Sequence, residues 1–270
     1  PSVDGSWVTN TGTLTSADHQ IQTPIVDFNG STPLTVTKSG VNDLLLTVAN
    51  TYTGGTTINA GRIRVNTTSG FGTGTVTVNS GGTAMLSGAG TYANHGTFTV
   101  TGMTESTANP GAIRFVNNTI SGNVSIASGG ARIGGLSGVT GTITGALSGT
   151  GALEINSSAA THNSAITLSG DASGYSGATT VSQGSLTIAG NFGGSVSKAA
   201  GTTLTNNGSI AGDHTHTTGV LQGTGSFGGN LTLNGSTAAD VLNVVSGSMH
   251  VAGDVTLSGT TTVRASGLGG

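Results

Sequence analysis

The sequence predicts an all-β fold, a parallel β-solenoid that forms one elongated rod. A strand–turn–strand unit occurs twice, at residues 44–65 and 166–188. A chain that repeats one such unit is typical of a stack of similar coils, each of which buries its apolar face against the next. Short apolar runs of period two and a low aromatic content of 4% favour the same fold.

The two copies of the unit read LLLTVANTYTGGTTINAGRIRV and ITLSGDASGYSGATTVSQGSLTI. In each copy an apolar run leads into Tyr-x-Gly, a Thr-Thr pair, a β-branched residue, a turn glycine and a second apolar run. The repeat positions are Tyr52, Gly54, Thr56, Ile58 and Gly61 in the first copy, and Tyr175, Gly177, Thr179, Val181 and Gly184 in the second. We expect the two tyrosines to occupy equivalent places in different coils.

Further strands are expected wherever apolar residues alternate with Thr, Ser, Asn or Asp. These runs lie at 75–78, 97–100, 123–126, 185–188, 230–233 and 254–257, and each ends at Gly, Asn or Ser-Gly. Glycine (49 of 270 residues) and β-branched residues disfavour helix. A β-sandwich would give a similar turn spacing, but the recurrent units favour the solenoid. A shorter unit also recurs, at 76–86, 124–133 and 196–204.

A coil of roughly 20 residues and a rung spacing of about 4.8 Å give about a dozen rungs and a rod of roughly 60 Å. The inward positions of these rungs should form one continuous narrow core. The residues expected there are Leu46, Val48, Ile58, Ile63, Val65, Val76, Val78, Leu186, Ile188, Leu231, Leu233, Val255 and Leu257.

Two regions are distinguished along the chain. Residues 1–35 hold Trp7 and three of the four prolines, and we expect an irregular N-terminal cap or first coils there, because proline and charge protect exposed strand edges. Residues 36–270 are expected to form the solenoid. The stretch 256–270 carries no charge except Arg264, so an identical chain or further rod is expected against this end.

The composition excludes several classes of function. Charged residues make up only 6% of the chain, and the net charge is −3. The seven Lys and Arg residues are scattered, so no basic stripe exists that would bind nucleic acid. No apolar run approaches the roughly 20 residues of a membrane-spanning helix. The absence of cysteine is compatible with secretion.

Residues 34–86 resemble the passenger-associated repeat of bacterial autotransporters. The positions that carry this resemblance are Lys38, Gly40, Leu44, Leu46, Asn50, Tyr52, Gly54, Thr56, Ile58, Gly61, Ile63, Val65, Gly72, Gly74, Val76, Val78, Gly81 and Gly82. A weaker second copy has Tyr175, Gly177, Thr179, Val181, Gly184, Leu186 and Ile188, and residues 223–263 resemble a later part of such passengers. The resemblance implies a right-handed parallel β-helix that is extracellular or displayed at the outer cell surface. It leaves the activity open, because such passengers serve as adhesins, aggregation factors, toxins and carriers of enzymes.

Residues with catalytic or ligating chemistry are sparse. Sugar hydrolysis needs two neighbouring carboxylates, and stacked coils would bring together distant acids such as Glu154 and Asp171. We expect these acids to be solvated turn residues. Arg62 and Arg64 share one face of a strand, where an anion would bind, and we expect a solvated surface there too.

His214 and His216 also share one face of a strand and are weak candidates for metal ligands. A zinc site needs three or four ligands, which His250 would have to complete from another coil. We therefore expect two exposed polar strand residues, no metal and no cofactor. Asparagines at run ends are expected to form hydrogen-bonded ladders: Asn50, Asn59, Asn66, Asn79 and Asn94.

These observations predict a non-enzymatic extracellular structural or adhesive β-solenoid, which acts as a stalk, an adhesin or a self-associating filament subunit. Its expected partners are identical rods, head-to-tail or side by side, and host or neighbouring cell surfaces. Low charge favours such contacts because repulsion between like rods is small. The alternative function is a β-helix hydrolase or lyase that acts on polysaccharide.

Overall fold

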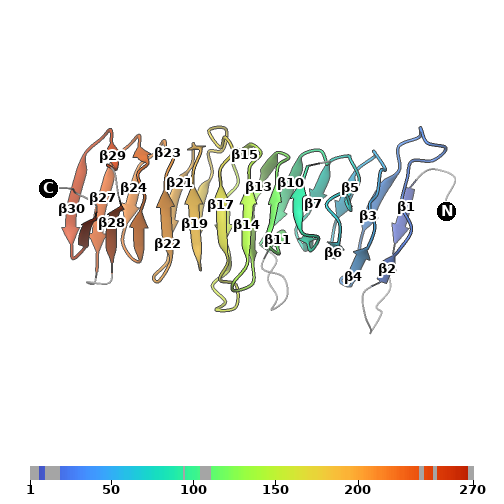
Figure 1. Cartoon of the computed structure of the whole chain (residues 1–270), viewed down its shortest axis with the longest axis horizontal. Helices are drawn as coiled ribbons and strands as arrows, with labels where there is room; N and C mark the ends of the chain where they lie inside the picture. Colours follow the sequence, from blue (N-terminus) through green and yellow to red (C-terminus); the bar gives the residue numbers. More distant parts are fainter. Residues whose placement is uncertain are drawn as a thin grey trace.

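Parallel backbone pairing between successive rungs builds the whole rod. The computed structural model describes residues 6–9, 19–93, 95–103, 111–236, 240–245 and 248–266. In these ranges no helix occurs, and the strand ladders are parallel throughout. The rungs stack into an elongated rod of about 11 turns, with the N-terminal strands at one end and the C-terminal strands at the other (Figure 1). The predicted parallel β-solenoid is confirmed.

The strands form three stacks along the rod, which we call the first, second and third faces. The first face contains β1 (Ser6–Thr9), β3 (Thr35–Lys38), β5 (Thr56–Ile58), β7 (Val76–Val78), β10 (Phe98–Gly102), the beginning of β13 (Val124–Gly135) and β15 (Leu147–Gly149). Isolated parallel bridges at Tyr175 and Ala172 continue this stack. It then contains β20 (Asn191–Phe192), β23 (Ser209–Ile210), β26 (Ser226–Phe227) and β29 (His250–Val251).

The second face includes the end of the long strand β13, whose beginning belongs to the first face. It contains β2 (His19–Ile21), β4 (Asp43–Leu46), β6 (Gly61–Val65), β8 (Gly82–Leu86), β11 (Ile113–Phe115), the end of β13, β16 (Leu153–Ile155), β18 (Ala178–Val181) and β21 (Ser195–Lys198). Against β21 lies β24 (His214–His216), followed by β27 (Leu231–Gly235) and β30 (Val255–Gly259).

The third face is the most regular. It contains β9 (Gly90–Tyr92), β12 (Asn118–Ile120), β14 (Thr140–Ile143), β17 (Ala165–Leu168), β19 (Ser185–Ile188), β22 (Thr203–Asn206), β25 (Val220–Gln222), β28 (Val241–Val245) and β31 (Thr262–Ser266). The coil length varies along the rod: register partners are 17 residues apart at Thr179 and Val196, and 26 apart at Phe98 and Val124.

Inward side chains of successive rungs stack in columns that form one core. On the second face one column runs through Leu44, Ile63, Ala84, Ile113, Ile133, Ile155 and Val181. All are buried. Alternation explains this arrangement, because every second residue of a strand points to the same face.

The predicted core is confirmed for all but three residues. Val48 is only half-buried, since it follows the end of β4 and lies outside the strand alternation. Val255 and Leu257 are 53% and 71% exposed. They continue the columns of Leu231 and Leu233, but β30 is the last described strand of its stack and nothing in the described part of the chain covers them.

The repeated tyrosines share a local environment but not a face of the rod. Both are fully buried. The Tyr52 hydroxyl lies 2.5 Å from Thr56 Oγ1, and the Tyr175 hydroxyl donates to the carbonyls of Gly151 (2.9 Å) and Ala178 (3.1 Å). The first copy leads into β5 on the first face, whereas the second leads into β18 on the second. The predicted equivalence is therefore wrong about the face, because the coil lengths between the copies differ.

The repeat glycines are required by close approach of the preceding coil. Gly61 and Gly184 have φ of 67° and 69°, which L side chains rarely adopt. A Cβ at Gly61 would lie 2.4 Å from the carbonyl oxygen of Asn42, and one at Gly184 would lie 2.2 Å from that of Ser164. Gly54 and Gly177 pack against the backbone of the previous coil in the same way.

Lys38 occupies an inward position on β3, in the column that continues through Ile58 and Val78. Its Nζ donates to the carbonyls of Ser39 (3.0 Å), Gly40 (2.6 Å) and Ala60 (3.2 Å). Burial lowers the pKa of Lys38, and Asp43 opposes this shift. The three carbonyls replace the water that a buried ammonium loses.

Residues 6–9 and 19–21 already belong to the stacks, because β1 pairs with β3 and β2 pairs with β4. The remaining residues before position 19 lie outside the described ranges. The boundary between residues 35 and 36 stays a prediction.

We predict that Ile58→Asp destabilises the rod by at least about 3 kcal/mol, because it places an unpaired charge in a dry core. The matched control is the outward neighbour Thr57→Asp, for which less than about 1 kcal/mol is expected. Thermal denaturation followed by circular dichroism measures both. Equal losses in the two variants would contradict the assigned inward and outward faces.

Candidate functional site

A ladder of six threonines runs along the outside of the third face. Successive rungs place these outward residues in register: Thr91, Thr119, Thr142, Thr167, Thr187 and Thr205. The side chains from Thr119 to Thr205 are partly exposed. Neighbouring rungs are about 4.8 Å apart, so the ladder presents hydroxyl and methyl groups at a regular spacing. We call these six residues the threonine ladder.

A shallow groove of about 400 Å³ runs beside the threonine ladder. Its lining comes from the starts of β14, β17, β19 and β22 and from the turns before them. It consists of Gly138, Val139, Thr140, Asn163, Ser164, Ala165, Gly184, Ser185, Gly201 and Thr203. The groove contains no charged or titratable group, so it offers neutral hydrogen-bonding chemistry and no catalytic acid or base.

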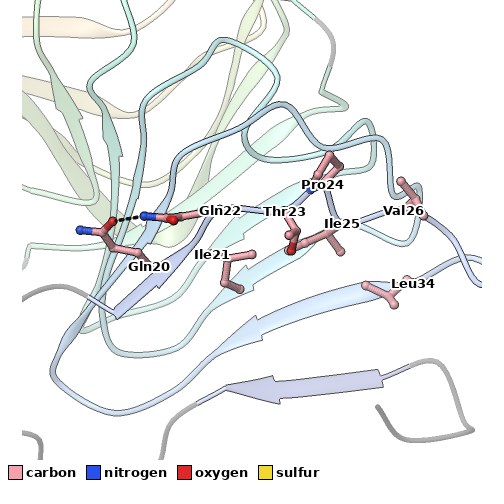
Figure 2. A pocket seen from close by; sticks show the side chains of 8 residues that line it. All are labelled: Gln20, Ile21, Gln22, Thr23, Pro24, Ile25, Val26 and Leu34. Atoms are coloured by element: carbon pink, nitrogen blue, oxygen red, sulfur yellow. Dashed lines mark hydrogen bonds between the residues drawn. The ribbon is translucent and has the colours of Figure 1, made fainter.

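An apolar pocket of about 430 Å³ lies at the N-terminal end of the described rod (Figure 2). Its lining consists of Gln20, Ile21, Gln22, Thr23, Pro24, Ile25, Val26 and Leu34. The only hydrogen bond drawn among these side chains joins Gln22 Nε2 to Gln20 Oε1, at 3.0 Å. The residues that line this pocket also include no titratable group, so they offer no catalytic acid or base.

His214 and His216 are buried inside the rod, so the expectation of exposed strand residues is wrong. Their register partners are Leu231 and Leu233, whose side chains fill the core of the next rung. His214 Nδ1 lies 2.9 Å from the carbonyl oxygen of Val196, and His250 is exposed on the first face. No group of three or more His, Cys, Asp or Glu residues within the described ranges has the arrangement of a metal site.

The candidate carboxylates have separate partners. Glu154 accepts hydrogen bonds from Arg132 Nε (2.9 Å) and Ser182 Oγ (2.6 Å) on the outside of the second face. Asp171 accepts hydrogen bonds from the backbone N and Oγ of Ser173, both at 3.1 Å. The structure gives these two acids no common site of the kind that glycoside hydrolysis needs.

Arg62 and Arg64 do share the outward face of β6, but they are half-buried. Arg62 pairs with Asp43 on β4. Sequence reasoning missed Arg114, which follows Arg64 and Met85 in the same row across β8 and β11. Burial lowers the pKa of Arg114, and the nearby Arg62 and Arg64 add to that shift.

The predicted asparagine ladder is present in part. Asn79 Nδ2 donates to Asn59 Oδ1 across one rung (2.7 Å). Asn50 is buried and joins three coils, since its Oδ1 accepts from Ile25 N (2.8 Å) and its Nδ2 donates to Gly70 O (2.7 Å). Asn94 lies outside the described residues.

A buried Ser–His contact was also missed by sequence reasoning. Ser157 Oγ lies 2.5 Å from His162 Nδ1, and both residues are fully buried. The proximity of serine and histidine within five residues is the only signal for it in the sequence. With no exposed surface, this pair offers a substrate no access to the hydroxyl.

We predict that purified protein contains far less than one zinc ion per chain, because the two buried histidines lack further ligands. Elemental analysis by mass spectrometry checks this. One zinc per chain, lost in a His214→Leu variant, would contradict the assignment of these residues to the core.

The described part of the chain contains no helix that could span a membrane. No curated protein and no solved structure is detectably similar to the chain. Residues 36–65 and 165–188 match the passenger-associated-transport-repeat family, whereas residues 223–263 lie outside the matched segments. With these two repeats and its parallel β-solenoid, the chain carries the passenger-associated transport repeat and fits the passenger domain of an autotransporter.

Proposed function

We propose that this chain is a non-enzymatic extracellular rod that acts as a stalk and adhesin at the outer cell surface. The observation that carries the proposal is the threonine ladder, a long outward surface in strict register. Passenger-associated repeats are associated with surface display or secretion, which supports the location.

The mechanical part of the function follows from the pairing of the rungs. Each rung donates and accepts backbone hydrogen bonds along the rod axis, and each inward side chain packs against the same position of the next rung. Pulling along the rod therefore loads many hydrogen bonds of the same kind at once, and the paired backbone resists proteolysis.

The adhesive part uses chemistry that a flat neutral surface provides. Threonine offers a hydroxyl that donates and accepts hydrogen bonds, beside a methyl group that is easily desolvated. Because charges are rare on the third face, the surface contacts a neutral partner without electrostatic repulsion. Many weak contacts along one rod combine into a stable attachment.

Two observations support a non-enzymatic role over the alternative of a polysaccharide-cleaving enzyme. Neither described pocket contains a carboxylate. Glu154 is engaged by Arg132 and Ser182 instead of facing a second acid.

We also propose that rods associate end to end. Val255, Leu257 and Val263 lie at inward positions of the last described rung and are more than half exposed. The opposite end presents the apolar pocket around Ile21, Ile25 and Leu34, beside the exposed Val26 and Phe28. Contact between two such ends would bury apolar surface on both.

We predict that Thr167→Lys combined with Thr187→Lys weakens attachment of rod-coated beads to cultured epithelial cells by at least about tenfold, equivalent to about 1.4 kcal/mol. The two residues are register neighbours in the threonine ladder. The matched control is Thr215→Lys with Thr232→Lys, a register pair on the second face, which should attach like the wild type. Equal attachment of the wild type and both variants would refute the ladder as the adhesive surface.

We predict that Val263→Asp shifts concentrated protein from end-to-end oligomers toward monomers, because a charge at an exposed inward position opposes burial. Analytical ultracentrifugation and electron microscopy measure the change. Thr256→Asp, on the outward side of β30, is the control. A wild type that stays monomeric at high concentration would contradict end-to-end association.

A further inference from the structure

A cluster of buried polar side chains interrupts the aliphatic core near the C-terminal end of the rod. It consists of His214 and His216 on β24, Lys198 on β21 and Asp240 before β28, and all four are buried. We call it the interior histidine cluster. At the equivalent positions of the next rung the core is formed by Leu231 and Leu233.

The imidazole rings of His214 and His216 have few hydrogen-bond partners. The ring of His214 stacks on Phe227, with centroids 5.3 Å apart and planes at 20°. Its Nδ1 meets the carbonyl oxygen of Val196 at 2.9 Å, but its Nε2 is buried and makes no hydrogen bond. Neither ring nitrogen of His216 makes one. A proton added to either ring would therefore leave buried N–H groups without acceptors.

The charges around the rings oppose protonation on balance. From β21, the ammonium of Lys198 repels a second positive charge at either ring. Asp240 attracts such a charge at His216, but its carboxylate already accepts hydrogen bonds from Gly219 N (3.0 Å) and Ser236 N (2.7 Å).

The other strands that neighbour the two histidines contribute apolar residues: Phe227 from β26, and Leu231 and Leu233 from β27. Asp213, next to β24, is exposed and bonded to Asn230 N.

His95, in the N-terminal half of the rod, provides an internal comparison. Its two ring nitrogens lie 2.6 Å from the carbonyl oxygen of Gly96 and 3.1 Å from that of Tyr92. Burial lowers the pKa of His95 as well, but the two carbonyls oppose this shift, because an imidazolium at this site would find an acceptor for each N–H. The surroundings of His214 offer one acceptor, and those of His216 offer none.

We propose that the interior histidine cluster makes the C-terminal rungs of the rod an acid-sensitive section, which opens on mild acidification while the N-terminal rungs stay folded. The rungs that open are those packed directly on β24, namely β21 to β27. Rods of stacked coils allow this, because each coil contacts only its neighbours and a local loss of stability need not spread.

The direction of the pH effect follows from the shifts at the two rings. Burial lowers the pKa of His214 and of His216 to about 4 each, from an ordinary value of 6.5. Above pH 6.5 both forms of the chain carry neutral rings, so the two histidines cost the section no stability there. Between pH 6.5 and about 4 the opened section binds more protons than the folded one, so stability falls as the pH falls. Below about pH 4 this contribution levels off.

Hydrogen exchange read by mass spectrometry tests the proposal. Exchange is corrected for the intrinsic pH dependence and compared at neutral pH and at about pH 4.5, in the full chain. Exchange over residues 195–235 should rise at least about tenfold relative to residues 56–100 of the same molecule. The variant His214→Leu combined with His216→Leu continues the leucine columns of β27 and should abolish most of this rise. The matched control is His250→Gln, at an exposed histidine, which should open like the wild type.

A second variant keeps the test decisive if the leucine variant does not fold. His216→Gln retains a polar side chain of similar reach but cannot titrate, so it should reduce the rise in exchange. The proposal is overturned if acid raises exchange equally in the two halves of the wild type. It is also overturned if folded leucine or glutamine variants open as readily as the wild type.

Discussion

The requirement that each rung match the next governs this structure. A parallel rung shares backbone hydrogen bonds with the rung before and the rung after, so inward residues must stack in columns such as Leu44–Ile63–Ala84. The lumen between the three faces has room only for these columns. Glycines at the corners, for example Gly61 and Gly184, follow from the same requirement, because the preceding coil lies too close for a Cβ.

The same matching produces the outer surface. When inward residues stack, outward residues are in register as well. In a chain rich in threonine, this register alone aligns outward threonines on successive rungs. The proposed adhesive function uses this by-product of the fold. The low charge of the chain fits such a surface, since like charges on neighbouring rungs would repel one another about 4.8 Å apart.

Most of the fold could be predicted from period-two alternation and the repeated unit, because both depend only on local sequence. The face reached by each copy could not be predicted, since it depends on coil lengths that vary between 17 and 29 residues. The burial of His214 and His216 was missed because histidine is polar. The signal was their alignment with Leu231 and Leu233, 17 residues later. The inward position of Lys38 was not predicted, although Lys38 is one of the positions that carry the family resemblance. The three carbonyls that hold its ammonium come together only in the folded turns.

Disulfide cross-linking tests the central claim, the parallel register of the rungs, most directly. The natural chain has no cysteine, so pairs introduced by mutation report on a single contact. Thr167→Cys with Thr187→Cys joins register neighbours and should oxidise almost completely, because adjacent rungs are within disulfide range. Thr167→Cys with Thr205→Cys spans two rungs and should stay reduced. Efficient cross-linking of the second pair and not the first would contradict the solenoid described above.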